Sequence, residues 1–284
     1  MKAFAKIFLL IAIFMLSACI SDQSAILRLA TTTSTYNSGL LDHILPVFEE
    51  RYKVRVDVLA VGTGQAIALG EAGDVDLILV HAINLEEIFI EEGHGIERHN
   101  VMYNDFVIVG PKNDSAGIRG LQLASNAFQI ILNSSSVFVS RGDESGTHYK
   151  EQLIWESLGL DQSEFGSWYK SIGQGMGDTL LFAEEVGAYT LSDRGTFLAL
   201  QDNLPSLEIL LGGNRIEENA DPLLINPYGI IPVNPAKGNV NSFLSEEFIL
   251  WLTDIEAQTL IANFGIQNFG QALFYPNSEV WIER

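Results

Sequence analysis

Three loops of this sequence combine hydroxyl-bearing or small residues with the start of a predicted helix. They are residues 31–34 (Thr-Thr-Thr-Ser), residues 62–65 (Gly-Thr-Gly-Gln) and residues 141–147 (Arg-Gly-Asp-Glu-Ser-Gly-Thr). The first turn of a helix has unpaired backbone N–H groups and a partial positive charge, which together favour an anion. Hydroxyls add donors, and small residues let an oxygen approach the backbone. One such loop is more often a capped helix without a ligand, but three in one chain predict a site for a small oxyanion.

Arg141 strengthens this prediction, because it stands at the end of a predicted strand in a chain with few cations. A guanidinium offers parallel N–H donors that match the oxygens of a tetrahedral anion. The other interpretation of Arg141 is a structural ion pair with Asp143 or Asp193. Asp143 could also serve both purposes, by holding the guanidinium from behind while Arg141 faces a ligand.

Strands alternate with helices from residue 26 onward. Residues 26–30, 54–61 and 75–80 predict strands, and the largely apolar run 75–80 is typical of a strand covered on both faces. This alternation predicts an α/β fold with a largely parallel sheet. In such sheets ligands bind beyond the carboxyl ends of the strands, which is where the three loops fall.

The alternating pattern breaks at Gly110 and Pro111, and a second α/β unit follows it. The proline-rich stretch 222–235 predicts an extended return to the first unit, which the C-terminal helices would complete. We therefore predict two α/β lobes joined by two crossover strands, with a ligand cleft between them. Lobe 1 comprises residues 26–109 plus 229–284, and lobe 2 comprises residues 110–228.

The composition excludes several classes of protein. The 284 residues include 16 basic and 36 acidic side chains, and the resulting net charge of −20 argues against a nucleic-acid binder. With 47% hydrophobic and only 18% charged residues, the chain is not a disordered polyelectrolyte. A single cysteine excludes a disulfide framework and any multi-thiolate metal site. The acidic surface does not exclude an anionic ligand, because exposed charges beyond about 8 Å are screened at physiological salt.

The first eighteen residues predict a secretory signal, with Lys2 and Lys6 before an apolar run that is too short to span a membrane. An N-terminal anchor helix is the alternative. The sequence Leu-Ser-Ala-Cys at residues 16–19 resembles the lipobox of bacterial lipoproteins, which implies cleavage before Cys19 and acylation of its thiol. The alternative is an incidental cysteine in an ordinary signal. Residues 19–25 would then form a tether.

Four segments resemble the tungstate-binding components of Tup-type ABC importers, relatives of molybdate- and phosphate-binding proteins. They are residues 31–34, 140–148, 173–177 and 188–196, and the resemblance extends over nearly the whole mature chain. It implies a type II periplasmic-binding fold that holds a tetrahedral oxyanion without a protein-bound metal or cofactor. It also implies an extracytoplasmic solute-binding protein, expected to be monomeric, held at the membrane by Cys19 and docking on an ABC permease.

The resemblance also implies which residues contact the anion. Side-chain contacts are expected from Thr33, Ser34, Thr63, Arg141, Ser145 and Thr147. Met176 and Gly177 are expected as backbone donors. Tyr189 matches a position where molybdate-binding proteins have a tyrosine, and it could equally be a core residue. Glu144 stands where the family pattern has Asp, a conservative departure.

Phosphate is the closest alternative ligand, because phosphate-binding proteins also carry an Arg-x-Asp-x-Ser-Gly-Thr loop, which residues 141–147 match. At neutral pH phosphate still bears protons and needs an acceptor, whereas tungstate bears none and takes only donors. Asp143 pointing into the cleft would favour phosphate, and Asp143 turned away would favour tungstate. The hydroxyl-rich loop 31–34 and residues 188–195 favour tungstate, with molybdate as the secondary ligand.

An enzyme is the more distant alternative. Ser34, Ser145 or Thr147 beside His148 or His81 could form a nucleophile and base, as in a hydrolase. The sequence has no Gly-x-Ser-x-Gly motif, and His148 directly after Thr147 is poorly placed to activate it. His94 and His99 lie among acidic residues, but their spacing does not stack them on one helix face, so we expect a solvated surface there. We therefore predict a binding protein and no catalytic residues.

Overall fold

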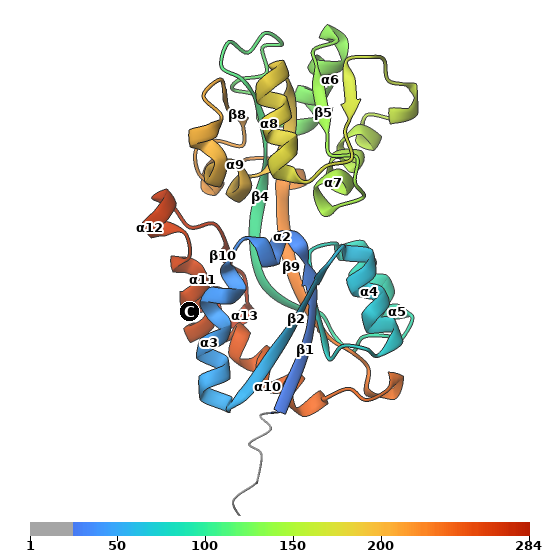
Figure 1. Cartoon of the computed structure of the whole chain (residues 1–284), viewed down its shortest axis with the longest axis vertical. Helices are drawn as coiled ribbons and strands as arrows, with labels where there is room; N and C mark the ends of the chain where they lie inside the picture. The colour runs from blue at the N-terminus through green and yellow to red at the C-terminus, as the bar shows by residue number, and fades with distance from the viewer. Residues whose placement is uncertain (1–24) are drawn as a thin grey trace, which may run out of the picture.

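The computed structural model describes residues 25–284 as two α/β lobes, one above the other (Figure 1). The predicted signal peptide (residues 1–18), Cys19 and all but the last residue of the predicted tether lie outside the described residues. Among residues 25–284, no helix combines the length and the hydropathy that a membrane span requires.

Lobe 1 is built on a mixed sheet in the order β2-β1-β3-β9-β4, with β10 paired to β4. Strands β1, β2 and β3 are parallel, and β9 and β4 run antiparallel to their neighbours. The strands are β1 (Ala25–Thr32), β2 (Val54–Val61), β3 (Leu77–Val80), β4 (His99–Pro111), β9 (Ile225–Pro232) and β10 (Tyr275–Pro276). The helices are α2 (Thr33–Asn37), α3 (Leu40–Tyr52), α4 (Thr63–Ala72), α5 (Ile83–Glu91), α10 (Ser242–Thr253), α11 (Ile255–Asn263), α12 (Ile266–Phe269) and α13 (Glu279–Ile282).

Helices cover both faces of this sheet. Leu77 and Leu79 of β3 pack with α3, α10 and α11, whereas Ile78 and Val80 pack with α4 and α5 on the other face. The alternation along β3 explains why residues 77–80 are all apolar, because a strand buried on both faces has no solvent side. The predicted strand is thus present and buried on both faces, but it begins at Leu77, and Asp76 before it is a buried acid that pairs with Arg28.

Lobe 2 has its own mixed sheet, in the order β4-β7-β5-β6, with β8 also paired to β4. Its strands are β5 (Phe138–Ser140), β6 (Tyr169–Ser171), β7 (Tyr189–Asp193) and β8 (Leu207–Leu211). Its helices are α6 (Ala124–Ser134), α7 (Gly146–Ser157), α8 (Met176–Val186) and α9 (Arg194–Leu200). Helices α6 and α7 pack on one face of the sheet, and α8 and α9 pack on the other. Short 3₁₀ helices complete the chain at Gln162–Glu164, Gln201–Asn203, Ile216–Glu218, Pro222–Leu224 and Pro235–Lys237.

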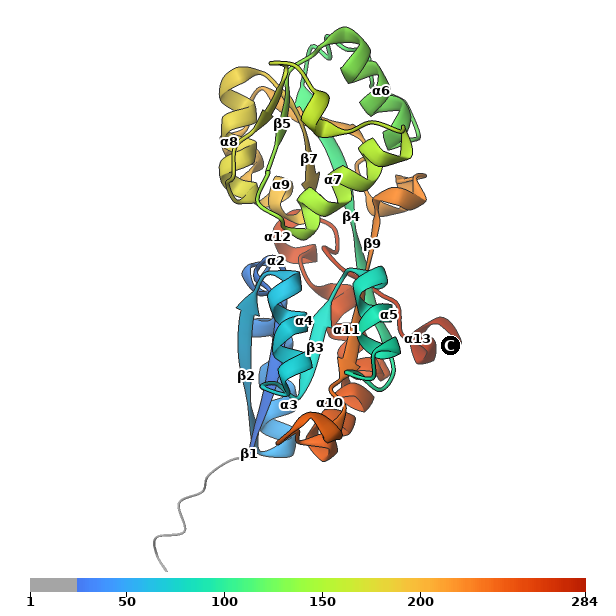
Figure 2. The ribbon, with the colours of Figure 1, turned by 90° about the vertical axis from the view of Figure 1, so that its right-hand side faces the viewer.

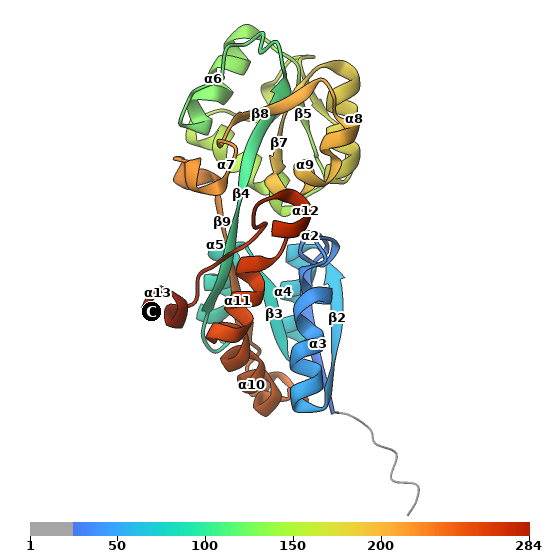
Figure 3. The same cartoon turned by 90° about the vertical axis from the view of Figure 1, so that its left-hand side faces the viewer.

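Two strands connect the lobes, and β4 belongs to both sheets (Figure 3). Residues 99–105 of β4 pair with β9 in lobe 1, and residues 106–109 pair with β7 in lobe 2. The chain therefore changes lobe at Asp105 and Phe106, and returns at Ile225, the partner of Asp105. The predicted boundaries, after residues 109 and 228, each lie four residues later than these changes of lobe. Gly110 does not mark a break, because β4 continues to Pro111. The glycine is needed there for packing, since a Cβ at Gly110 would lie 2.5 Å from the Tyr189 ring.

Candidate anion-binding site

A cavity of about 440 Å³ lies between the two lobes, and residues from both lobes and both connecting strands line it. The main polar residues that line it are Thr33, Ser34, Asn37, Ser38, His81, Asn104, Arg141, Thr147, Asp193, Thr196, Asn226 and Tyr228, together with the backbone of Gly175, Met176 and Gly177. Six of the nine predicted contacts are among the lining residues: Thr33, Ser34, Arg141, Thr147, Met176 and Gly177. The cavity thus collects donors that are far apart in the sequence.

The loop after β1 divides its hydroxyls between structure and cavity. Thr31 is buried and donates to the backbone oxygen of Leu79 at 2.7 Å. Thr32 caps α2, its Oγ1 accepting from Thr35 N at 3.2 Å. Thr33 and Ser34 follow at the start of α2 and line the cavity. The first two threonines therefore hold the loop, and the next two residues present hydroxyls to a ligand.

Arg141 follows β5 directly, and its side chain is only 11% exposed. Its Nε and Nη2 donate to Oδ2 of Asp143 at 3.2 and 2.5 Å, and its Nη1 lies 3.4 Å from Thr147 Oγ1. The other oxygen of Asp143 accepts from Ser145 N at 3.2 Å. Asp143 thus holds the guanidinium from the side, and Arg141 itself lines the cavity.

The pKa of Asp143 reflects this arrangement. Partial burial of the carboxyl acts to raise its pKa, but hydrogen bonds from Ser145 and the charge of Arg141 outweigh burial and lower the pKa below its usual value. Asp143 therefore stays ionised at neutral pH and keeps the guanidinium in one orientation.

Two long helices of lobe 2 begin at the cavity, and so does the shorter α9, which is capped by the carboxylate of Asp193. Helix α7 starts at Gly146, capped by Ser145, whose Oγ accepts from His148 N at 3.3 Å. Helix α8 starts at Met176 after Gly175, without a side-chain cap. Because these helices have twelve and eleven residues, each brings a developed dipole and unpaired N–H groups to this place. Lobe 2 therefore supplies Arg141 and the N-termini of two long helices to the cavity.

Three predicted contacts lie outside the cavity lining. Tyr189 is wrong as an anion contact, because it stands at the start of β7, and the opposite end of that strand, Asp193, reaches the cavity. Its ring is buried in the core of lobe 2, and its hydroxyl donates to Asp114 at 3.1 Å. Ser145 caps α7 as described above, and Thr63 is the first residue of α4. Both stand at the predicted helix starts, but neither is among the residues that line the cavity.

His81 is one of the lining residues that sequence reasoning did not assign to the ligand. It follows β3 directly, so the same strand-end rule that singled out the other loops would have found it. Its Nδ1 lies 3.1 Å from Asn226 Oδ1 and its Nε2 lies 3.3 Å from Thr32 Oγ1. Burial lowers the pKa of His81 to about 4, so the imidazole is neutral at physiological pH.

Asp193 is a carboxylate at the cavity wall, and it caps α9. Its Oδ1 accepts from Thr196 N at 2.8 Å, and its Oδ2 accepts from Thr196 Oγ1 at 2.7 Å. The neighbouring Arg194 is buried and pairs with Asp105, with N–O distances of 2.8 and 2.6 Å. The sequence left open whether an ion pair of Arg141 would involve Asp143 or Asp193. In the structure Arg141 pairs with Asp143.

A metal ion would find few ligands in the described residues. Glu71, Glu92 and His94 have side-chain ligand atoms within 4.8 Å of one another, on the outside of lobe 1. Both glutamates are exposed, and His94 Nε2 lies 3.4 Å from Glu92 Oε2. The acidic residues predicted as a solvated surface thus form a loose surface cluster that is separate from the cavity.

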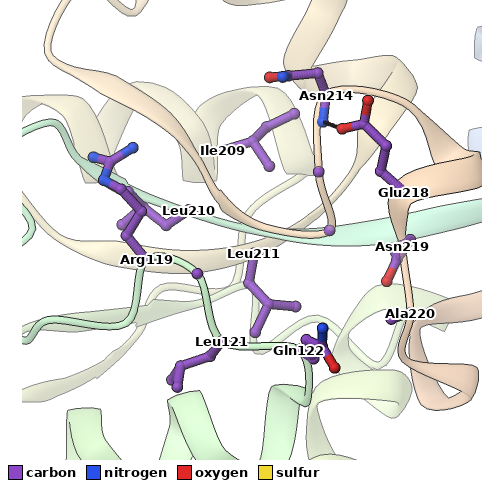
Figure 4. A pocket seen from close by; sticks show the side chains of 13 residues that line it. Arg119, Leu121, Gln122, Ile209, Leu210, Leu211, Asn214, Glu218, Asn219 and Ala220 are labelled. Carbon is purple, nitrogen blue, oxygen red and sulfur yellow. Dashed lines mark hydrogen bonds between the residues drawn. The ribbon is translucent and has the colours of Figure 1, made fainter.

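A second cavity, of about 390 Å³, lies in lobe 2 between β8 and residues 119–122 (Figure 4). Its charged side chains are occupied: Arg119 pairs with Glu208, and Glu218 accepts from Asn214 N at 2.7 Å. None of the nine predicted contacts lines it. The donors suited to an anion are therefore concentrated in the cavity between the lobes.

Two α/β lobes joined by two strands around a polar cavity define a class of proteins that enclose a small solute. The comparison with known families agrees, since the PBP superfamily domain matches residues 20–256. This match covers most of the chain, including all of lobe 2 and the elements of lobe 1 up to α10.

Individual relatives show which family within this superfamily the chain resembles. A protein of Haloferax volcanii is 51% identical over 253 residues, covering 89% of this chain and 72% of its own. The tungstate-binding protein TupA of Peptoclostridium acidaminophilum is 43% identical over 254 residues, which cover 88% of this chain and 85% of that protein. The structure of the tungstate-binding protein TupA from Desulfovibrio alaskensis G20 covers 90% of this chain and 100% of its own, with 42% identity and a TM-score of 0.80. The chain belongs to the PBP superfamily, in the family of the TupA proteins.

Proposed function

We propose that this chain binds tungstate, and secondarily molybdate, as the extracytoplasmic solute-binding component of an ABC importer. The TupA relatives support this function, and so does the fold that the chain shares with them. The observation that carries the proposal is the cavity between the lobes, where Arg141, hydroxyl groups and two helix N-termini meet. Such a set of donors suits a compact, fully ionised anion.

The orientation of Asp143 favours tungstate over phosphate. Both of its oxygens accept hydrogen bonds from Arg141 or Ser145 N, and it lies outside the cavity lining. Phosphate at neutral pH retains a proton that must be given to an acceptor, whereas tungstate has none to give. Phosphate remains the second candidate because Asp193 does line the cavity, although both of its oxygens already accept from Thr196.

The proposed contacts are Thr33 and Ser34 from lobe 1, Arg141 and Thr147 from lobe 2, and the backbone N–H groups of Met176 and Gly177. Closing of the lobes about the two connecting strands would complete this shell, and a permease would recognise the closed form. We propose that neither a cofactor nor a protein-bound metal takes part and that the chain is not an enzyme. Support for the last point is that His148 Nδ1 accepts from Glu144 N at 3.1 Å and so does not face a hydroxyl.

We further propose that the mature protein is a monomer anchored to the membrane by a lipid on Cys19. The sequence at residues 16–19 supports the anchor, although these residues lie outside the described part of the chain. Mass spectrometry of the N-terminal peptide from membranes tests it. An unmodified cysteine in that peptide would contradict the anchor.

A thermal-unfolding panel with tungstate, molybdate, sulfate and phosphate tests the ligand. Tungstate at a thousandfold its dissociation constant should add about 4.1 kcal/mol to the free energy of unfolding, because only the native protein binds it. Molybdate should give a similar gain and sulfate little. A larger gain with phosphate would assign the site to phosphate, and Asp193→Asn should then weaken that phosphate binding.

A further inference from the structure

His81 is held firmly on lobe 1. The amide nitrogen of Asn226 donates to Asn104 Oδ1 at 2.7 Å, so its oxygen faces the imidazole and accepts from Nδ1. The unprotonated Nε2 is then free to accept from the hydroxyl of Thr32. The imidazole also packs on the ring of Tyr228, with 4.6 Å between the ring centroids. These contacts leave His81 little freedom to move.

The anchors of His81 belong to the strands that connect the lobes. Asn104 lies on β4 and Asn226 on β9, and the two residues are direct partners across these strands. Thr32 lies at the end of β1, immediately before the loop that presents Thr33 and Ser34. His81 is therefore fixed both to the place where the lobes join and to the hydroxyl loop of lobe 1.

The free edge of the imidazole meets lobe 2 at Gly146. A Cβ built on Gly146 would lie 2.6 Å from His81 Cε1, 3.3 Å from Nδ1 and 3.4 Å from Nε2. Gly146 is the first residue of α7, immediately before Thr147, which lines the cavity. Figure 2 shows α7 reaching down to the top of lobe 1 at this place. A glycine here allows a closer approach of the lobes than any other residue would.

We propose that the contact between His81 and Gly146 is a steric stop that sets how far the lobes close, and so selects oxyanions by size. The proposal rests on the proposed function, since it explains how that cavity discriminates among tetrahedral anions. Tungstate and molybdate are nearly equal in size, whereas sulfate is smaller because its bonds to oxygen are shorter. With the lobes held apart by a rigid ring, sulfate cannot touch donors on both sides at once.

The chemistry of His81 fits a spacer better than a charged ligand. Its burial keeps the ring neutral, and both nitrogens have partners on lobe 1 and its connecting strands. Packed contacts resist compression, so the imidazole ring of His81 sets a fixed minimum distance between the two lobes. A gap of half an ångström or more around a small anion forfeits a large part of its contact energy.

The test compares the dissociation constants for tungstate and sulfate in the full mature chain, measured by calorimetry, for four proteins: the natural sequence, Gly146→Ala, His81→Ala and the double variant. Gly146→Ala should weaken tungstate binding by about 5- to 150-fold, because the new methyl group overlaps the imidazole and holds the lobes apart. His81→Ala should let the lobes close further and reduce the preference for tungstate over sulfate by about tenfold or more.

The double variant is the decisive protein. In the absence of the ring the methyl group of residue 146 has room, so Gly146→Ala should cost less than about threefold in the His81→Ala background. Equal losses in both backgrounds would overturn the steric stop, and so would an unchanged tungstate-to-sulfate ratio in His81→Ala. Gly64→Ala is the matched control, since Gly64 also lies in the first turn of a helix but nothing lies within 4 Å of its Cβ position.

The same measurements distinguish a failure of the proposed function from a failure of the steric stop. If the natural sequence binds none of the tetrahedral anions, the proposed function fails before the stop is tested. If it binds tungstate tightly and the four proteins show additive effects, only the stop is wrong. The far-ultraviolet circular dichroism and melting temperature of each protein without ligand show whether His81→Ala folds. Should it not fold, His81→Asn, which keeps a side chain able to bond Asn226 but lacks the ring edge, replaces it in the same comparison.

Discussion

The two lobes contribute different things to the cavity between them. Lobe 2 brings a guanidinium and the N-termini of α7 and α8, which together make it the electropositive side. Lobe 1 brings the hydroxyls of Thr33 and Ser34 on the short helix α2, and a neutral, fixed imidazole. The difference indicates that the two lobes have separate roles. Lobe 2 attracts the charge of the anion, and lobe 1 sets the size of the cavity.

Two buried glutamates, one in each lobe, have different hydrogen-bond partners. In lobe 1, Glu86 is fully buried and accepts from Arg98 Nε at 2.6 Å, so its charge has a partner. In lobe 2, Glu151 is buried on α7, and Trp155 Nε1 and Tyr169 OH donate to it at 3.2 and 2.7 Å. These donors are neutral, so burial dominates and raises the pKa of Glu151 to about 7.

The largest effect should come from removing the charge of lobe 2. Arg141→Ala should weaken tungstate binding by at least about 100-fold, because each hydrogen bond to a charged group contributes roughly 1.5–3 kcal/mol and the guanidinium can make two. Isothermal titration calorimetry measures the loss. Arg55→Ala, at an exposed arginine of β2 on lobe 1, should bind as the natural sequence does. Equal binding by the two variants would remove Arg141 from the site.

The buried acid of lobe 2 should make stability depend on pH. The folded-state pKa of Glu151 is raised, so the folded protein keeps a proton that the unfolded chain has lost between about pH 4.5 and pH 7. The contribution of Glu151 is therefore fully present below pH 4.5 and disappears as pH rises through 7. Glu151→Gln should raise the free energy of unfolding at pH 8 by on the order of 3 kcal/mol and change little at pH 4.5.

Urea unfolding at both pH values measures this difference, with Glu156→Gln as the control at an exposed glutamate of the same helix. A gain in the free energy of unfolding at pH 8 that is absent at pH 4.5, and absent in the control, supports the prediction that the buried carboxyl of Glu151 has no charged partner. If Glu151→Gln destabilises the protein at pH 8, the carboxylate has a partner that its contacts do not reveal.

The smallest effect should come from the hydroxyls of lobe 1. Ser34→Ala should weaken tungstate binding by roughly 10- to 150-fold, because the hydroxyl makes one hydrogen bond to the charged ligand, worth about 1.5–3 kcal/mol, whereas the guanidinium can make two. Competition with molybdate in the same titration measures the loss, and Ser163→Ala, at an exposed serine of lobe 2, is the control. A loss as large as that of Arg141→Ala would mean that lobe 1 carries as much of the binding as lobe 2.

The strand-end rule predicted much of the cavity. Thr33 and Ser34 follow β1 and Arg141 follows β5, so local sequence placed them where strands end. Tyr189 came from the family resemblance instead, and it does not line the cavity, because residues 188–196 span a whole strand and only its far end reaches the cavity. A motif specifies the residues of a strand, whereas the direction of the strand in the sheet decides which of them meets a ligand.

By itself the amino-acid sequence determined the α/β alternation, the double burial of β3 and the donor chemistry of the loops, because these depend on hydrophobic period and on neighbouring residues. Only the tertiary structure decided where the chain changes lobe, that Asp143 turns toward Arg141, and that His81 meets Gly146. These features depend on how two separately packed sheets are set against each other by β4 and β9. Such distances between remote segments arise from packing, which no local pattern of residues encodes.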